Sequence, residues 1–292
     1  LYHAKDHRRG TAVLFSTEHE ARLRRQAAIE QALRHARLED EFTLAFQPMI
    51  DGFTHRTIAF EALARWVSPT LGCVSPDQFI PVAERTGLIN QLTEVLLVKA
   101  LRAAGTWPET VSLSFNLSMA DLCSPVAVER LCALIVRSGI DPGRIQLEAT
   151  ETAIIQDFDL AQAALLRLKR LGVSISLDDF GTGYSSLSYV HRLPVDKLKI
   201  DRSFTQAILE HETSRNIVRS IIDLSRNLKL GCVVEGVETA EQVVLLSTLG
   251  CTAMQGYFFH KPMPEAEVLA FLDRSSNAVV DPVGAHPMID AA

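Results

Sequence analysis

The sequence lacks any apolar run approaching the roughly 18 residues that a bilayer-spanning helix needs, so it predicts no membrane segment in this fragment. It also lacks a basic excess: 29 Lys and Arg residues against 35 Asp and Glu residues give a net charge of −6, which argues against a polymeric nucleic acid as partner. Its five cysteines are scattered and include no C-x-x-C pair. This excludes a disulfide framework and a zinc site, and it is typical of a reducing, cytoplasmic environment. The chain begins with Leu1 and has no apolar leader, so we expect a piece of a longer protein that could be membrane-anchored further upstream.

Strand-like and helical runs alternate along most of the chain. Runs rich in apolar and β-branched residues predict eight strands, at 43–50, 56–66, 111–116, 144–149, 173–179, 196–200, 231–236 and 252–259. Helical stretches are expected between most of them, at 77–104, 124–138, 157–171, 203–229 and 239–249. About eight strands with intervening helices predict an α/β fold, a (β/α)₈ TIM-like barrel.

One connection departs from the regular barrel. Only Asp51 to His55 separate the first two predicted strands, whereas a parallel crossover needs a dozen or more residues. These two strands should therefore pair as a hairpin. The sequence predicts a barrel whose first strand is antiparallel to the rest.

Polar side chains lie at the ends of nearly all the predicted strands, except that Glu61 is expected late within its strand. They are Glu61, Asn116, Glu148, Asp178, Asp179, Lys199, Asp201, Glu235 and Gln255. A single acid at such a position is often only a cap for the next helix, but carboxylates that converge on one barrel mouth repel each other unless cations lie among them. Carboxylate and amide oxygens favour Mg²⁺ or Mn²⁺ over Zn²⁺. The pattern therefore predicts a metal site at the carboxyl ends of the strands.

Two features of this rim indicate chemistry on a phosphate ester. The neighbouring acids Asp178 and Asp179 precede a glycine-containing loop, where a turn of the backbone would let both acids bridge two metals. Lys199 alternates with apolar neighbours, so it should point away from the apolar layer, and among carboxylates and a phosphate it can hold a water or an anionic oxygen. Arg65 lies near the mouth, where a phosphate contact and a structural ion pair are equally plausible.

An ordered set of motifs resembles the EAL domain family, bacterial phosphodiesterases specific for cyclic di-GMP. The motifs are Phe46-Gln47-Pro48, Glu61-Ala62-Leu63 with Arg65-Trp66, Phe79-Ile80-Pro81, Asn116-Leu117-Ser118, Glu148-Ala149-Thr150-Glu151, Asp178-Asp179-Phe180-Gly181-Thr182-Gly183, Lys199-Ile200-Asp201, Glu235-Gly236-Val237-Glu238 and Gln255-Gly256. The resemblance covers roughly Phe42 to Leu272. None of these positions departs from the family pattern, which implies an active enzyme rather than a degenerate binding copy.

The resemblance also implies a reaction and the roles of the site residues. Cyclic di-GMP would be hydrolysed to linear 5′-pGpG with two Mg²⁺ or Mn²⁺ ions per site, as part of bacterial second-messenger signalling. By that resemblance the first ion is held by Glu61, Asn116, Glu148 and Asp178, and the second by Asp178 and Asp179. Glu235 is the expected general base, and Lys199 is expected to position the attacking water.

Further positions have supporting roles by the same resemblance. Nucleotide contacts are implied for Gln47, Leu63 and Arg65. Auxiliary roles are implied for Asp201, Glu238 and Gln255. Glu151 would tether the loop from Asp179 to Gly183, which in this family links the site to dimer contacts, so a homodimer is expected.

Four segments are expected along the chain. Residues 1–15 resemble the C-terminal remnant of a GGDEF (diguanylate cyclase) domain, which implies such a domain upstream in the parent chain. Residues 16–40 would form a connecting helix, 41–275 the phosphodiesterase domain, and 276–292 a flexible tail. Two other functions remain open: a catalytically silent cyclic di-GMP receptor, and a one-metal barrel lyase or aldolase that binds a small carbonyl acid.

Overall fold

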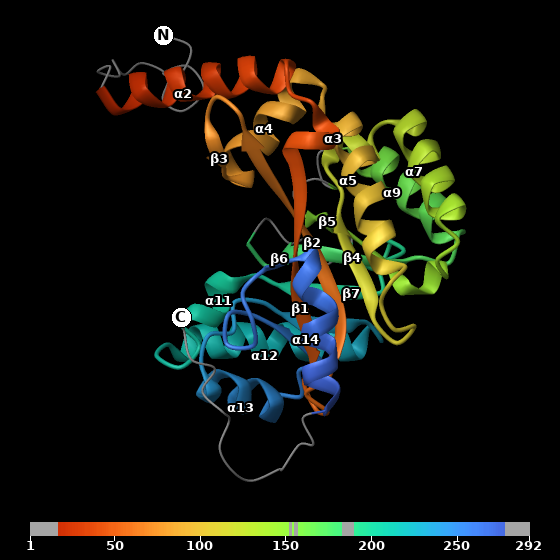
Figure 1. Ribbon diagram of the computed structural model, residues 1–292. Coiled ribbons are helices and arrows are strands. Elements are labelled where there is room, and N and C mark those ends of the chain that lie inside the picture. Colours follow the sequence, from red (N-terminus) through yellow and green to blue (C-terminus); the bar gives the residue numbers. More distant parts are fainter. Residues whose placement is uncertain (1–16, 152–153, 155–156, 183–189, 278–292) are drawn as a thin grey trace.

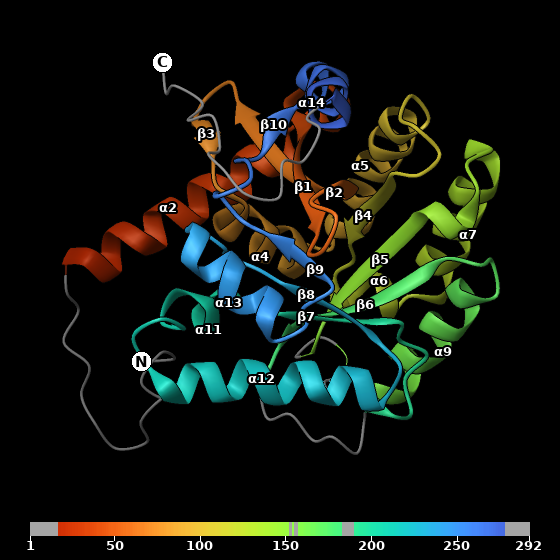
Figure 2. The ribbon, with the colours of Figure 1, turned by 90° about the horizontal axis from the view of Figure 1, so that it is seen from below.

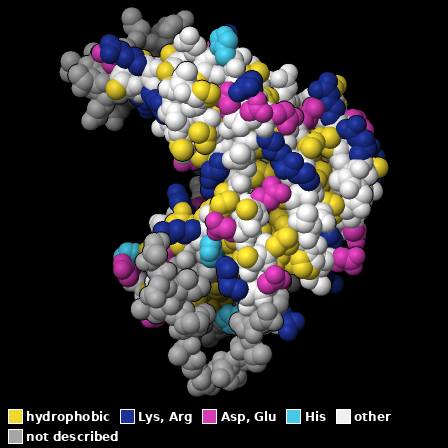
Figure 3. Space-filling model, in the orientation of Figure 1, with side chains coloured by type: hydrophobic (Ala, Val, Ile, Leu, Met, Phe, Trp, Pro, Cys, Tyr) yellow, Lys and Arg dark blue, Asp and Glu magenta, His cyan; other side chains and the backbone are white. Residues whose placement is uncertain are grey.

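The computed structural model describes residues 17–151, 154, 157–182 and 190–277. The expected remnant at 1–15 lies outside the described residues, as does all but the start of the expected tail. Within the described part of the chain, no helix is both long enough and apolar enough to cross a membrane. On the face seen in Figure 3, acidic and basic side chains are interspersed with hydrophobic ones.

Eight strands close into a barrel, as predicted (Figures 1 and 2). They are β1 (Phe42–Asp51), β2 (Thr57–Ser68), β4 (Ser112–Asn116), β5 (Ile145–Thr150), β6 (Ser174–Phe180), β7 (Lys197–Ile200), β8 (Gly231–Val234) and β9 (Ala253–Gln255). Around the barrel the order is β1-β9-β8-β7-β6-β5-β4-β2, and pairing of β1 with β2 closes the ring. Two short strands extend the sheet: β3 (Gly72–Val74) pairs with β2, and β10 (Met263–Pro264) pairs with β1.

The reversed first strand is confirmed. β1 pairs antiparallel with both β2 and β9, while the other neighbours in the barrel pair in parallel. The hairpin turn is stabilised by Asp51, whose Oδ1 accepts hydrogen bonds from the backbone N–H groups of Phe53 and Thr54. We call the carboxyl ends of the parallel strands the mouth of the barrel and the opposite ends the floor.

Helices cover the outside of the barrel (Figure 2). They are α2 (Thr17–Arg34), α3 (Leu38–Glu41), α4 (Pro76–Thr86), α5 (Ile89–Ala104), α6 (Met119–Leu122), α7 (Pro125–Ser138), α9 (Phe158–Lys169), α11 (Arg202–Gln206), α12 (Glu212–Asn227), α13 (Ala240–Thr248) and α14 (Glu265–Asn277), with a 3₁₀ turn at Pro142–Arg144. The expected single helix at 77–104 is wrong. Gly87 adopts a left-handed φ of 73° that ends α4, and α5 begins at Ile89. The expected helix at 203–229 is likewise two helices, because the chain turns between α11 and α12 and buries Ile208 there.

The first described helix packs against α4. Ile29 and Leu33 of α2 are buried in the common core, and Glu30 pairs with Arg85 of α4 at 3.3 Å. The beginning of α2 extends away from the rest of the molecule (Figure 1). Packing on one half of this helix therefore attaches it to the side of the barrel that carries α4.

A close backbone contact joins β9 to the loop after β8. Gly256 lies against Val237, whose N–H donates to the carbonyl of Gln255 at 3.0 Å, and a Cβ on Gly256 would overlap Val237 backbone atoms. We expect Gly256→Ala to lower the free energy of unfolding by about 3 kcal/mol, since backbone atoms on both sides must move. Urea denaturation measures this. In the control Gly105→Ala, the added Cβ comes no closer than 3.4 Å to its neighbours, and we expect little change. Equal stability of the two variants would contradict the prediction.

Candidate active site

The ammonium group of Lys199 lies at the centre of a carboxylate cluster inside the barrel. Its Nζ is 2.5 Å from Glu235 Oε1, 2.6 Å from Glu148 Oε2, 3.2 Å from Asp178 Oδ1 and 3.7 Å from Glu61 Oε2. The Lys199 and Glu148 side chains are buried, while Glu235 is 20% exposed and thus the most accessible of the four acids. Residues far apart in the sequence are brought to one point by the barrel.

Strand register explains this convergence. Asn116 of β4 lies opposite Glu148 of β5, and Glu148 lies opposite Ser176 of β6, so their side chains follow one another around the barrel wall. The expectation that Glu61 lies late in its strand is wrong. β2 continues to Ser68 because it pairs with β1 and β3 beyond the ring, which leaves Glu61 in mid-strand.

Amide side chains hold the Glu61 carboxylate in place. Asn116 Nδ2 donates to Glu61 Oε1 at 2.7 Å, and Gln255 Nε2 donates to Glu61 Oε2, also at 2.7 Å. Gln255 Nε2 also contacts Gln47 Oε1 at 3.2 Å, and Gln47 Nε2 donates to the carbonyl of His260. The other amide oxygen, Gln255 Oε1, is buried and has no hydrogen-bond partner among the described residues. The cluster thus contains, beside its carboxylates, an amide oxygen that accepts no hydrogen bond from the described residues.

The backbone turns at Asp179, as the adjacent acids require. Asp179 has a φ of 53°, in the left-handed region, and the register between β6 and β7 shifts at this point. The turn keeps both carboxylates of the Asp178–Asp179 pair near the cluster, and Asp178 Oδ1 accepts the Asp179 N–H at 3.0 Å. Farther along, the Gly181 N–H donates to the buried Glu151 at 3.5 Å.

Four other expected residues make no hydrogen bond or ion pair with the acids around Lys199 in the described part of the chain. Asp201 follows β7 and caps α11, with Oδ1 accepting the Ser203 N–H at 3.0 Å. Glu238 is exposed, and its backbone N–H donates to Gln242. Leu63 lines a cavity at the mouth. Arg65 donates to the Ala64 carbonyl, and none of the ion pairs between described residues involves it, which disfavours the structural ion pair.

Negative charge exceeds positive charge in the cluster. Burial, together with the charges of Glu61 and Asp178, raises the pKa of Glu148 to about 7 and that of Glu235 to about 8, although Lys199 acts in the opposite direction. Burial also raises the pKa of Asp179 to about 6. Burial disfavours the charged form of Lys199, but the surrounding carboxylates raise its pKa well above its ordinary value. One ammonium group therefore does not neutralise all of these acids.

This donor set suits divalent cations that prefer oxygen ligands. Several carboxylates, the Asn116 amide and the unpartnered Gln255 oxygen converge here. In the described part of the chain, however, no three His, Cys, Asp or Glu residues are arranged to hold a metal ion as they stand. Lys199 Nζ lies among the carboxylate oxygens that would bind a metal ion. The ammonium group and a bound cation would therefore compete for the same oxygens.

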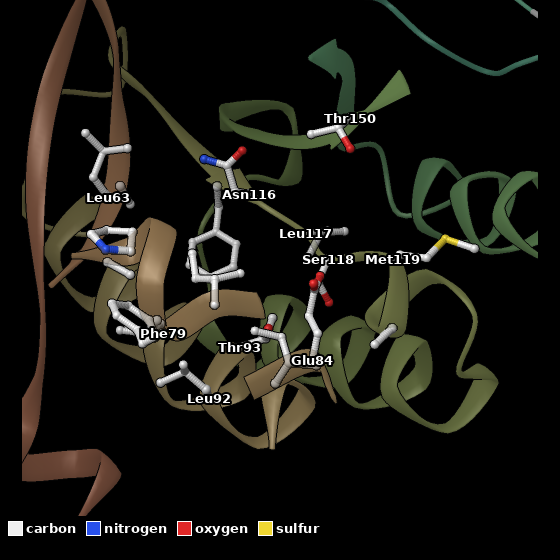
Figure 4. Close-up of a pocket in the computed structure, with 18 of the residues that line it drawn as sticks. Leu63, Phe79, Glu84, Leu92, Thr93, Asn116, Leu117, Ser118, Met119 and Thr150 are labelled. Atoms are coloured by element: carbon white, nitrogen blue, oxygen red, sulfur yellow. The ribbon is translucent and has the colours of Figure 1, made fainter. Parts of the chain in front are cut away.

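Figure 4 shows residues that line a cavity of about 920 Å³, and one of them, Asn116, donates a hydrogen bond to Glu61 of the cluster. The cavity lies between α4, α5, α6 and the ends of the neighbouring strands. Its wall is mostly apolar and includes Leu63, Phe79, Leu92 and Leu117, whereas Asn116 and Asp179 lie where it meets the acids. The polar cavity residues Glu84 and Thr93 were not predicted from the sequence, because they lie on helices rather than at strand ends. An apolar cavity next to a charged centre suits a ligand with both ring systems and phosphates.

The raised carboxyl pKa values predict how stability depends on pH without metal. Between the ordinary value of 4.5 and the folded values of about 7 and 8, Glu148 and Glu235 hold protons in the folded protein that the unfolded chain releases. The free energy of unfolding must therefore fall as pH rises through this window. We expect a loss of about 2 kcal/mol or more between pH 6 and 8.5, measured by urea denaturation in EDTA. Glu148→Gln removes one of the titrating groups and should make the loss smaller. Stability that rises with pH in the unsubstituted protein would contradict the prediction.

Comparison with known proteins agrees with this geometry. The family model described as EAL domain matches residues 30–262. An uncharacterized signaling protein of Caulobacter vibrioides is 39% identical over 90% of this chain, which spans 33% of that relative. The bifunctional diguanylate cyclase/cyclic di-GMP phosphodiesterase MucR of Pseudomonas aeruginosa is 37% identical over 92% of this chain, which spans 40% of that protein. A solved structure described as the PaMucR phosphodiesterase in a c-di-GMP complex is 37% identical, with a TM-score of 0.78 over 82% of this chain and 99% of that one.

Proposed function

The chain belongs to the EAL domain family, and from this membership we propose that it is a metal-dependent phosphodiesterase that hydrolyses cyclic di-GMP to linear 5′-pGpG. The observation that carries the proposal is the set of four acids around Lys199, which adjoins the mouth cavity through Asn116, a cavity residue that donates a hydrogen bond to Glu61. Relatives whose names include this activity support the choice of substrate.

Two Mg²⁺ or Mn²⁺ ions would be held by the acids at the mouth. Glu61, Asn116, Glu148 and Asp178 are the proposed ligands of the first ion, and Asp178 with Asp179 of the second. When bound, such ions stabilise charge on a phosphate and lower the pKa of a bound water. Release of Lys199 from part of its carboxylate contacts would accompany binding, because the same oxygens serve both.

Glu235 is the proposed general base. Its carboxylate is the most accessible of the four acids around Lys199 and would take a proton from the attacking water, whose oxygen forms a new bond to phosphorus. The bond from phosphorus to one 3′ oxygen breaks, and that oxygen gains a proton to become the 3′ hydroxyl. Lys199, whose Nζ is 2.5 Å from Glu235 Oε1, would orient the water. Gln47, Leu63 and Arg65 are the proposed nucleotide contacts, with Glu151, Asp201, Glu238 and Gln255 in supporting roles.

The direct test is to incubate the protein with cyclic di-GMP and Mg²⁺ or Mn²⁺ and to separate the products by chromatography. Appearance of pGpG supports the phosphodiesterase. Tight binding of cyclic di-GMP without product would instead indicate a receptor module. The absence of both binding and turnover would overturn both functions.

The MucR relative carries a cyclase function in its name, so we also propose that α2 and α3 connect this domain to an upstream GGDEF domain. We further propose that the protein acts as a homodimer in the cytoplasm.

A further inference from the structure

A row of polar side chains continues below the acids, toward the floor of the barrel. Ser114 of β4 and Gln146 of β5 are 0% and 1% exposed, and Lys197 of β7 is partly buried beside them. This part of a TIM-like barrel is normally filled by branched apolar side chains. Burying polar groups here is unfavourable unless each one makes hydrogen bonds.

The contacts form a continuous path to Glu148. Lys197 Nζ donates to Gln146 Oε1 at 2.5 Å, and Gln146 Nε2 donates to Glu148 Oε1 at 2.9 Å. Ser114 Oγ donates to the same Glu148 oxygen at 2.5 Å. One oxygen of Glu148 therefore receives two donors from below, while the other, Oε2, is directed at Lys199 Nζ.

The barrel wall makes room for this path at Gly231. Lys197 lies directly opposite Gly231 of β8, and a Cβ on Gly231 would come within 3.0 Å of Lys197 Cγ. A larger residue at Gly231 would therefore press on the stem of Lys197, which passes this point on its way to Gln146.

We propose that Gln146 and Lys197 are positioning residues that fix the Glu148 carboxylate for binding the first cation. Lysine can only donate hydrogen bonds, so it selects the oxygen of the Gln146 amide and leaves the NH₂ group to face Glu148. Without Lys197, the amide can rotate and present its oxygen to the carboxylate, which repels it. The inference rests on the proposed function, in which Glu148 is a metal ligand. Hydrogen-bond partners of metal ligands typically contribute 10–100-fold to metal affinity.

The test measures Mn²⁺ binding by the folded protein in the absence of nucleotide, from the electron paramagnetic resonance signal of unbound Mn²⁺. We expect Gln146→Leu and Lys197→Met each to weaken binding about tenfold. The double variant should bind no more weakly than Gln146→Leu alone, because Lys197 acts through Gln146. At saturating Mn²⁺, the turnover of cyclic di-GMP should stay within about threefold of that of the unsubstituted protein. General structural damage would lower both the Mn²⁺ affinity and the turnover at saturating Mn²⁺.

Lys169→Met is the matched control. It removes a nearby lysine that pairs with Asp196 at 2.5 Å, and its Mn²⁺ affinity should not change. Affinity within twofold of the unsubstituted protein in Lys197→Met would overturn the inference, and so would additive losses in the double variant. Lys197 is the first residue of β7, at the floor, and is only partly buried, so Lys197→Met should fold. Its Mn²⁺ affinity therefore tests the inference even if Gln146→Leu does not fold.

The two proposals can fail separately. Hydrolysis and Mn²⁺ binding by the unsubstituted protein, with unchanged affinity in the variants, would refute only the positioning role. Absence of Mn²⁺ binding by the unsubstituted protein would overturn both proposals.

Discussion

Replacing Glu235 by alanine is expected to lower the turnover of cyclic di-GMP by about 10²–10⁴-fold, the usual contribution of a general base. The carboxylate proposed to accept the proton of the attacking water would be gone, while the proposed first-cation ligands and the mouth cavity would remain. Binding of cyclic di-GMP should therefore be retained. Steady-state assays at saturating Mg²⁺, combined with calorimetric measurement of ligand binding, separate the two effects.

The control for this variant is Glu241→Ala, which removes an exposed acid from the neighbouring helix α13 and should leave turnover unchanged. Glu235→Gln provides a second comparison, because it keeps the size of the side chain but cannot accept the proton in the same way. Unchanged turnover in both Glu235 variants would refute the assignment of the base.

Removal of divalent cations is expected to reduce turnover to background, with recovery on addition of Mg²⁺ or Mn²⁺. Without them, the acids of the cluster face only the single charge of Lys199, so their negative charge exceeds the positive charge beside them and the charge on the phosphate in the transition state loses the stabilisation that the cations would supply. Assay of EDTA-treated protein before and after titration with each cation tests this.

The matching variant is Asp178→Asn, which keeps the shape of a residue proposed to contact both cations. We expect its activity to stay near background even at high Mn²⁺. Circular dichroism of the EDTA-treated protein and of this variant should match that of the untreated protein, which shows that loss of activity is not loss of fold. Full activity in EDTA would exclude the metal-dependent mechanism.

The architecture could be predicted because two local signals agreed. Apolar runs located all eight barrel strands, and the five-residue connection from Asp51 to His55 required an antiparallel hairpin. Helix breaks were harder to find. The stop at Gly87 depends on its left-handed φ, while neighbouring residues Arg85 and Thr86 are compatible with a continuing helix.

Site residues that lie at strand ends could be found from position alone, and the barrel places Glu148, Asp178 and Glu235 around Lys199. The polar row beneath them was missed. Gln146 is two residues from Glu148 and so shares its face of β5, a signal the sequence does contain. That it receives a hydrogen bond from Lys197 depends on how the strands are staggered, which the sequence pattern does not specify.

The reversal of β1 determines where the preceding chain reaches the barrel. In an ordinary barrel the first strand starts at the floor, but here its first residue, Phe42, pairs with Trp66 near the mouth end of β2. Lys99 of α5 donates to the Phe42 carbonyl at 2.6 Å, and Trp66 donates to Glu41 at 3.0 Å, so this junction is anchored. A rotation of α2 would therefore act on the mouth of the barrel, next to α4, without first being transmitted along the length of the barrel.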